Sequence, residues 1–500
     1  MLEVERKFGV GPGFVLPDLT GHVPEGGTLL PLPAQTLRAT YYDTADLRLT
    51  RAGVSLRQRK GEPGKPPWTM KLPTDVVGAR AEFSRGRLDE LLPVLTAYHR
   101  GWTVVPVVSI RTLRRVFEVR DAAGELLVEV CDDTVSVLSG REVVDTFREI
   151  EAERGSCDDA LFDAIGRTLT EAGAVEDAFV PKHVRALGER IPAPDAPAGE
   201  TAGDAVTAAF RAHVARIVGA DPYLRLGTPQ PNGDSPVHQL RVGCRRLRSD
   251  LRTFRPLLDP EWARALADEC RWLAGSLGAA RDSEVLRVRL RRTAAADPVA
   301  PLDPDAVERI DAALAARLSE ALGDPAEAVD SPRYLALLEQ LNVAATAPPL
   351  LRKAKRPAVD VLPKLVAKPW RRLADGREGE VAPAELDPLG PDDEWHEVRI
   401  RGKKARYAAQ SVVPAIGEPA RALIAGLKKV QKLLGEHQDA AMAADAWRAV
   451  ADAVPADHGV ALTAGRLIER ERAAVRAARA AFPEAWAIAT EPERIAWLST

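Results

Sequence analysis

The chain has 500 residues, of which 46% are hydrophobic and 28% are charged, and its formal net charge is −3 at pH 7. This length is ample for two or three globular domains with real cores, and no apolar run approaches the ~20 residues that a membrane span needs. The N-terminus lacks the pattern of a signal peptide, so we expect a cytoplasmic protein without membrane contact. The four cysteines form no CxxC pair, which argues against a zinc site and a disulfide framework.

Short β-prone runs, separated by Gly, Pro and Asp turns, occupy the first part of the chain. In chain order these predicted strands are residues 2–8, 36–44, 54–60, 68–72, 107–119, 125–138 and 146–153. The first run, LEVERKF, alternates so that Glu3, Glu5 and Lys7 share one face. Two enclosed carboxylates at this spacing raise each other's pKa unless a cation lies between them. This face therefore needs a partner of positive charge.

Selected charges also recur on single faces of the later strands. They are Arg57 with Arg59, Lys71, Arg111 with Arg115, and the alternating Glu149, Glu151 and Glu153. Each strand alone fits a solvated face, but the whole set favours the inside of a β-barrel. A tunnel lined by both signs suits a polyanion that Arg and Lys hold by charge-assisted hydrogen bonds. Mg²⁺ or Mn²⁺ would bridge the polyanion to the carboxylates.

The ordered motifs of residues 1–187 resemble the CYTH superfamily, the triphosphate tunnel enzymes that include class IV adenylate cyclases, thiamine triphosphatases and inorganic triphosphatases. Glu3-x-Glu5-x-Lys7 is similar to the family's ExExK signature, and TYYDT, SLRQR, MKL, CDD, REIEAE and PKHVRAL follow in the family's order. The resemblance implies an antiparallel eight-stranded tunnel in which water attacks a phosphoryl group. Positioning and electrostatics would then carry most of the catalysis.

The same resemblance assigns roles to individual residues. It implies that the divalent metal, Mg²⁺ or Mn²⁺, is held by Glu3, Glu5, Glu149 and Glu151, with Asp132 and Glu153 as helpers. It implies that the phosphates are bound by Lys7, Arg57, Arg59, Lys71, Arg111, Arg115 and Lys182, with Arg38 as a further candidate. The expected catalytic set is Glu3, Glu5, Lys7, Glu149 and Glu151.

A boundary falls at residues 188–203, GERIPAPDAPAGETAG, where Pro, Gly and Ala indicate a linker between two domains, 1–187 and 204–500. After it Ala, Leu and Arg dominate, and apolar residues recur at spacings of three and four, which predicts helices. Helix N-terminal signals recur in SPVHQL, DPEW, SPRYL and GPDDEW. The predicted fold class is therefore α+β, with a β-barrel tunnel followed by an all-α domain.

One predicted helix, in HQLRVGCRRLRSDLRTFR, carries a uniform basic stripe. Counting from His238, basic residues occupy the a/d positions of a heptad, which are normally apolar: Arg241, Arg245, Arg248 and Arg252. The opposite face is apolar and predicts the core contact through Leu240, Cys244, Leu247 and Leu251. Like charges three and four residues apart destabilise a free helix, so the stripe calls for a counter-charge.

The stripe is repeated later in the chain. HEVRIRGKKAR places His396, Arg399, Lys403, Lys404 and Arg406 in the pattern of His238, Arg241, Arg245, Arg246 and Arg248. LGAARD, residues 277–282, is likewise echoed by LGEHQD, residues 434–439. These matching offsets predict a duplicated unit, with repeats at about 204–325 and 330–485 that form a pseudo-two-fold pair of helical bundles. The second stripe continues to Gln410 and Val413, so the halves need not contribute equally.

Residues 204–485 resemble the CHAD family, the conserved histidine α-helical domain, whose members bind polyphosphate in a basic pore and often follow a CYTH domain. The resemblance implies polyphosphate binding by His238, Arg241, Arg245, Arg246, Arg248, Arg252, His396, Arg399, Lys403, Lys404 and Arg406. The expected partners are tripolyphosphate and inorganic polyphosphate, with polyphosphate granules as a further candidate.

Two classes of function remain open on these observations. The favoured one is a metal-dependent hydrolase of tripolyphosphate or short polyphosphate, whose helical domain recruits long-chain polyphosphate; an organic triphosphate, thiamine triphosphate or a nucleotide, would fit the same tunnel. The other is a non-catalytic protein with a degenerate tunnel that binds polyphosphate granules. Nucleic-acid binding is disfavoured, because no aromatic stacking residues accompany the stripes and no DNA- or RNA-binding fold signature is present.

Overall fold

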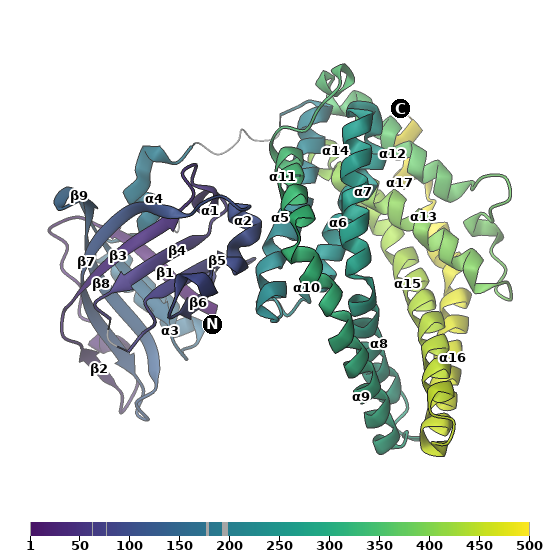
Figure 1. Ribbon diagram of the computed structural model, residues 1–500, viewed down its shortest axis with the longest axis horizontal. Helices are drawn as coiled ribbons and strands as arrows, with labels where there is room; N and C mark the ends of the chain where they lie inside the picture. Colours follow the sequence, from purple (N-terminus) through teal and green to yellow (C-terminus); the bar gives the residue numbers. More distant parts are fainter. Residues whose placement is uncertain (1, 63, 77, 177–179, 193–198, 500) are drawn as a thin grey trace. The chain divides into compact units, whose positions relative to one another are not determined.

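The computed structural model describes residues 2–62, 64–76, 78–176, 180–192 and 199–499. The chain divides into two compact units, one formed by residues up to 194 together with 225–234 and the other by the remaining residues (Figure 1). Residues 193–198 of the predicted linker lie outside the described residues, and the first helix after them begins at Ala202. None of the described helices is long and apolar enough to cross a membrane.

The first unit is a closed antiparallel β-barrel. Eight strands follow one another around it in the order β1, β6, β5, β4, β3, β7, β8 and β9, and pairing between β9 and β1 closes the ring. Two short strands, β2 and β10, pair with β7 and β1. The strands are β1 (Leu2–Val10), β2 (Thr28–Pro31), β3 (Gln35–Asp43), β4 (Ser55–Lys60), β5 (Trp68–Pro73), β6 (Ala79–Arg85), β7 (Val105–Arg120), β8 (Leu126–Ser139), β9 (Glu142–Arg154) and β10 (Val175–Glu176). The predicted eight-stranded antiparallel barrel is confirmed.

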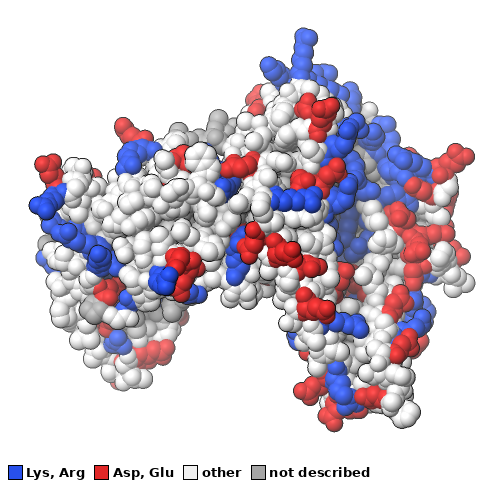
Figure 2. Space-filling model, viewed as in Figure 1, with Lys and Arg blue, Asp and Glu red and all other residues white. Residues whose placement is uncertain are grey.

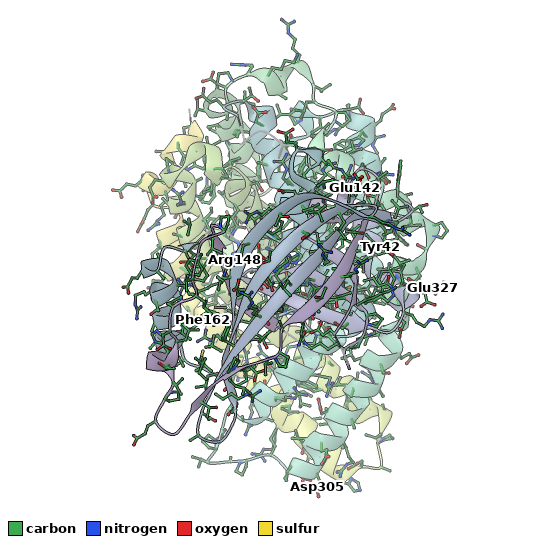
Figure 3. The ribbon with its side chains drawn as sticks, turned by 90° about the vertical axis from the view of Figure 1, so that its left-hand side faces the viewer. Tyr42, Glu142, Arg148, Phe162, Asp305 and Glu327 are labelled. Carbon is green, nitrogen blue, oxygen red and sulfur yellow. The ribbon has the colours of Figure 1, made fainter. Side chains whose placement is uncertain are left out.

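The apolar core of this unit lies mostly on the outer face of the barrel. Helix α3 (Asp159–Glu171) packs Phe162 and Ile165 against Phe8 of β1 and Ile150 of β9, all of which are buried (Figure 3 labels Phe162). This arrangement reverses the usual one, because the charged faces of the strands point inward and the apolar faces must be covered from outside. The remaining helices of the unit are α1 (Arg48–Arg51), α2 (Thr96–His99) and α4 (Lys182–Leu187).

The second unit is helical, as predicted. Its helices are α5 (Ala202–Leu226), α6 (Pro236–Thr253), α7 (Pro260–Ser276), α8 (Gly278–Ala294), α9 (Pro304–Ala321), α10 (Gly323–Asp330), α11 (Pro332–Thr346), α12 (Ala358–Ala374), α13 (Asp392–Ser411), α14 (Val413–Ile416), α15 (Glu418–Ala453), α16 (His458–Ala489) and α17 (Pro492–Ile495). Three of the four predicted N-terminal signals form side-chain caps: Ser235, Asp259 and Ser331 cap α6, α7 and α11, and each is followed by proline at the first helical position. The fourth, GPDDEW, also starts a helix, α13 at Asp392, but its N-cap is Pro391 and no side chain caps it.

The two predicted repeats differ in continuity. In the first, α6 packs on α7, and the chain breaks at Leu277 before it continues as α8. In the second, α13 packs on α15, a single helix of 36 residues that contains the whole LGEHQD motif. The long helices then pair, α8 with α9 and α15 with α16 (Figure 1). The matching sequence motifs therefore lie at a helix break in the first repeat and inside a continuous helix in the second.

Candidate functional site in the barrel and on two helices

The barrel encloses a cavity of about 660 Å³ whose wall carries side chains of both charges. Its basic lining residues are Lys7, Arg57, Arg59, Lys65, Lys71, Arg80, Arg114, Arg154 and Lys182. Its acidic lining residues are Glu3, Glu5, Glu62, Glu82, Glu129, Glu151 and Glu153. Guanidinium and ammonium groups bind phosphate oxygens, whereas carboxylates bind divalent cations. This space is therefore suited to an anion that is accompanied by a cation.

One group of buried carboxylates already surrounds an ammonium group. Lys182 Nζ of α4 lies 2.9 Å from Asp133 Oδ2 and 2.6 Å from both Glu149 Oε1 and Glu151 Oε1. Lys7 Nζ lies 2.5 Å from the same oxygen of Glu151. Burial alone would raise the pKa of Glu151, but Lys182 and Lys7 outweigh it and hold that pKa well below its ordinary value. The chain itself thus supplies the cation at this group.

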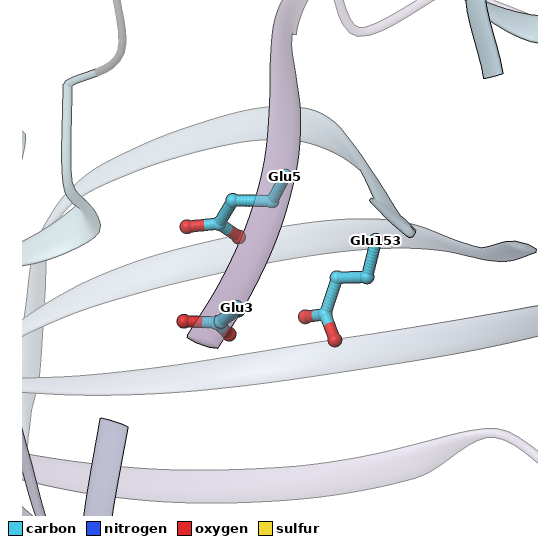
Figure 4. Close-up of side chains that lie close together, drawn as sticks. All are labelled: Glu3, Glu5 and Glu153. Atoms are coloured by element: carbon cyan, nitrogen blue, oxygen red, sulfur yellow. The ribbon is translucent and has the colours of Figure 1, made fainter. Parts of the chain in front are cut away.

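In a second group of carboxylates, the neighbouring cations offset burial less fully. Glu3 and Glu5 of β1 and Glu153 of β9 bring carboxylate oxygens within 4.8 Å of one another (Figure 4). Lys71 Nζ is 2.5 Å from Glu3, but burial raises the pKa of Glu5, and burial together with the charge of Glu151 raises the pKa of Glu153 to about 7. A divalent cation at this group would offset the repulsion among its carboxylates.

Two predicted arginines project into the cavity from β4. Arg57 and Arg59 lie on one face of the strand, and Arg59 is paired with Glu62. Arg57 Nε is buried and has no hydrogen-bond partner among the described residues. A buried guanidinium with an unused N–H can donate a hydrogen bond to an anionic oxygen.

Most of the residues predicted for the tunnel lie in it. Those that line the cavity are Glu3, Glu5, Lys7, Arg57, Arg59, Lys71, Glu151 and Lys182, and Glu149 belongs to the group around Lys182. The alternation along β1, β4, β5 and β9 predicted the positions on those strands, whereas Lys182 on α4 was expected from the family resemblance.

Four predicted positions lie elsewhere. Ile110 and Thr112 of β7 line the cavity, so Arg111 and Arg115 point outward and are exposed, and Arg38 of β3 is exposed for the same reason. Both faces of β7 carry arginine, and alternation alone does not say which face is inside. The inward arginine is Arg114, whose Nη2 lies 2.6 Å from Asp133 Oδ2.

The predicted tunnel residue Asp132 does not point to the inside of the barrel, whereas the next residue, Asp133, does. It lies on the outer side of β8, where Arg148 of β9 donates two hydrogen bonds of 2.8 Å to its carboxylate (Figure 3 labels Arg148). Its neighbour Asp133 is the inward carboxylate, with an exposed fraction of 0%. The adjacent acids of CDD stand on opposite faces, and nothing local in the sequence distinguishes them.

Sequence reasoning missed β6 and one histidine. Arg80 and Glu82 line the cavity from β6, and their spacing of two in ARAEFSR was the available signal. His183 follows Lys182 on α4, lines the cavity and is buried. Its ring stacks on Tyr41, with centroids 4.9 Å apart and an interplanar angle of 18°.

The helical unit brings its two basic stripes together. Helix α6 packs against α13, and the Arg246 guanidinium lies 4.9 Å from the ring centroid of Tyr407 on α13. Lys and Arg gather over these two helices in Figure 2. The repeat is also visible in ion pairs, since Arg241 lies 3.8 Å from Asp282 and Arg399 lies 3.6 Å from Asp439. Both acids end their LG motifs, so the matching offsets reflect matching contacts.

The two basic stripes contain more Arg and Lys side chains than acidic partners for them. Within the described part of the chain, six guanidinium Nε atoms on α6 and α13 are buried without a hydrogen-bond partner: those of Arg241, Arg245, Arg246, Arg399 and Arg406, which belong to the stripes, and that of Arg401. Burial, then Arg399 and Arg245, lowers the pKa of Lys403 to about 7. The apolar face predicted for α6 is confirmed, because Leu240, Cys244, Leu247 and Leu251 are buried. Such crowding favours a bound polyanion.

Comparison with known protein families agrees with this division. The CYTH domain model matches residues 1–175, and the CHAD domain model matches residues 208–448. Two uncharacterised proteins of Mycobacterium tuberculosis, MT2285 and Rv2226, are each 29% identical over 470 residues, which cover 88% of this chain and 86% of theirs.

Several solved structures are similar to parts of this chain. PptA from Streptomyces chartreusis is 25% identical with a TM-score of 0.46, and the match covers 58% of this chain and all of that one. A putative adenylate cyclase from Vibrio parahaemolyticus is 19% identical with a TM-score of 0.25 over 37% of this chain and 98% of its own. HpAC1 from Hippeastrum, described as a putative adenylyl cyclase with a dominant triphosphatase activity, is 17% identical with a TM-score of 0.23 over 37% of this chain and 95% of its own.

Proposed function

This chain carries a CYTH domain followed by a CHAD domain, and on that premise we propose that it is an inorganic triphosphatase that also binds polyphosphate. The barrel hydrolyses tripolyphosphate or short-chain polyphosphate with Mg²⁺ or Mn²⁺, and the helical domain binds long-chain polyphosphate and so brings the protein to polyphosphate granules. The observation that carries the proposal is the enclosed 660 Å³ cavity lined by both signs of charge. Among its described lining residues the aromatic rings are Tyr41 and His183, which stack on each other, so an inorganic chain fits better than a stacked base.

The donor set of the second carboxylate group fits a hard divalent cation. Glu3, Glu5 and Glu153 would hold Mg²⁺ or Mn²⁺, since both prefer oxygen ligands and this group has the raised carboxylate pKa values. Asp133, Glu149 and Glu151 also lie close enough together to hold an ion, but Lys182 already contacts all three carboxylates, so we assign the ion to the other group. When bound, the ion supplies neutralisation of the charge that develops on the phosphoryl oxygens.

The cationic side chains orient the substrate. Arg57, Arg59 and Arg80 reach the cavity from β4 and β6 and would bind phosphate oxygens through several N–H groups each. Holding the chain in one geometry sets the scissile phosphoryl group in line with the attacking water, which is the main protein contribution in phosphoryl transfer. No nucleophilic side chain is needed.

The decisive experiment is phosphate release from a panel of tripolyphosphate, short and long polyphosphate, thiamine triphosphate and ATP, with Mg²⁺ or Mn²⁺. We expect tripolyphosphate to give the highest kcat/KM, and Glu5→Gln to lower it by a factor of about 100 or more, as loss of a metal ligand does. Glu142→Gln, on an exposed position at the start of β9, is the matched control. A panel with no release from any compound, but with intact polyphosphate binding, would favour the non-catalytic alternative.

A further inference from the structure

The lumen contains a buried imidazole that the proposed chemistry has not used. His183 lines the cavity and is only 3% exposed. Its Nε2 atom is buried and has no hydrogen-bond partner among the described residues. Buried polar atoms almost always have a partner, so an unpaired nitrogen on a residue that lines a cavity points to a ligand in that cavity.

The imidazole cannot easily turn away from the lumen. One face of the ring stacks on Tyr41 at a centroid distance of 4.9 Å. Tyr41 is itself fixed in an apolar cluster with Ile110, Phe147 and Leu187. The ring plane is therefore set by packing.

The charges around the ring select the kind of ligand. Arg80 of β6, Lys7 of β1 and Arg57 of β4 act on it from three strands, with the Tyr41 ring on β3 and Lys182 beside it on α4. Burial and then these cations lower the pKa of His183 to about 3, so the imidazole is neutral at pH 7. A neutral imidazole can donate one N–H bond without adding to the repulsion among the cations.

We propose that His183 is a further substrate-binding residue, whose Nε2–H donates a hydrogen bond to an oxygen of the phosphate chain held by Arg57 and Arg80. This inference rests on the proposed function and names a contact within that same site. A directional neutral donor adds one more contact that orients the phosphate group, beside those of the two guanidinium groups.

Two variants of His183 separate the hydrogen bond from the packing. His183→Phe keeps a ring against Tyr41 but removes the donor, whereas His183→Gln can place an amide N–H near the position of Nε2. We expect His183→Phe to lower kcat/KM for tripolyphosphate by a factor of about 10 to 100, the worth of one hydrogen bond to a charged group. His183→Gln should recover most of this loss, and thermal unfolding of both variants checks that the barrel is intact.

A binding measurement keeps the test independent of turnover. The full chain with ¹⁵N-labelled histidine is titrated with tripolyphosphate in the absence of divalent ions, and the signal of His183 is identified by its loss in His183→Phe. We expect the Nε2 resonance to shift on saturation, while that of His22, which already contacts Thr168 Oγ1 at 2.7 Å, stays in place. An unmoved His183 signal, or wild-type kcat/KM in His183→Phe, overturns the proposal. If the wild type hydrolysed no tripolyphosphate, the proposed triphosphatase function would be wrong. The titration would still test whether His183 contacts the bound tripolyphosphate.

Discussion

At the scale of single residues, the pKa of each buried carboxylate in the barrel depends on the cations beside it. Asp133 and Glu151 surround Lys182, and the pKa of each lies below its ordinary value, although burial opposes this. Glu5 lies 3.5 Å from Lys7 Nζ, but burial outweighs that cation and raises the pKa of Glu5; burial and the charge of Glu151 raise the pKa of Glu153. The same residue type therefore plays two parts, a fixed counter-ion in one group and an exchangeable proton or metal ligand in the other.

This sorting predicts different outcomes for two adjacent acids. Asp133→Asn removes the inward carboxylate between Lys182 and Arg114, so we expect kcat/KM for tripolyphosphate to fall at least tenfold and stability to drop by about 3 kcal/mol, the usual cost of breaking a buried pair. Asp132→Asn breaks the outer pair with Arg148 and should leave kcat/KM nearly unchanged. Steady-state phosphate release and urea unfolding of both variants check this. If Asp132→Asn lost as much activity as Asp133→Asn, Asp132 would belong to the substrate site after all.

At the scale of elements, the sequence predicted which charges share a strand face but not which face is inside. Glu3, Glu5 and Lys7 on β1 were placed correctly because their strand carries charge mainly on one face. On β7, arginines occupy both faces, and Arg114 rather than Arg111 is the inward one. Strand β6 was missed because ARAEFSR has few β-branched or aromatic residues. Strand β6 forms because it pairs with β1 and β5, and the pairing with β1 is a long-range contact that the local sequence does not reveal.

The pairing of α6 with α13 gives a pH dependence that neither helix would have alone. Arg245 on α6 and Arg399 on α13, together with burial, lower the pKa of Lys403 to about 7. A bound polyanion raises that pKa, so binding takes up a proton above pH 7, and the affinity for long-chain polyphosphate should fall by at most about tenfold per pH unit from pH 7 to 9.

Lys403→Arg provides the matched control for this effect. Arginine keeps its charge throughout the range, so its affinity for polyphosphate should vary little between pH 7 and 9. Titration calorimetry in buffers of different ionisation enthalpy measures the proton uptake directly. An equally steep pH dependence in both proteins would assign the proton to another group.

At the scale of the whole molecule, a net charge of −3 conceals two separate concentrations of cation. The barrel holds its cations beside carboxylates in an enclosed cavity, whereas the stripes of α6 and α13 have few acidic partners. Among the described residues, the groups of carboxylates that could hold a divalent ion lie in the barrel. Catalysis and long-chain binding should therefore depend on different residues and fail independently.

The independence of the two sites can be tested in the full chain. Arg245→Gln combined with Arg399→Gln removes a cation from each stripe, and we expect the Kd for long-chain polyphosphate to rise by roughly 100-fold, since each charge-assisted hydrogen bond is worth about 1.5–3 kcal/mol. Hydrolysis of tripolyphosphate should stay within about twofold, because these residues are absent from the lining of the barrel cavity. Arg317→Gln with Arg421→Gln, at exposed positions on α9 and α15, removes the same charge outside the stripes and should leave both properties unchanged. Because surface charge acts over a distance, a similar loss of binding in this control would show that net charge, and not the paired stripes, holds the polyanion.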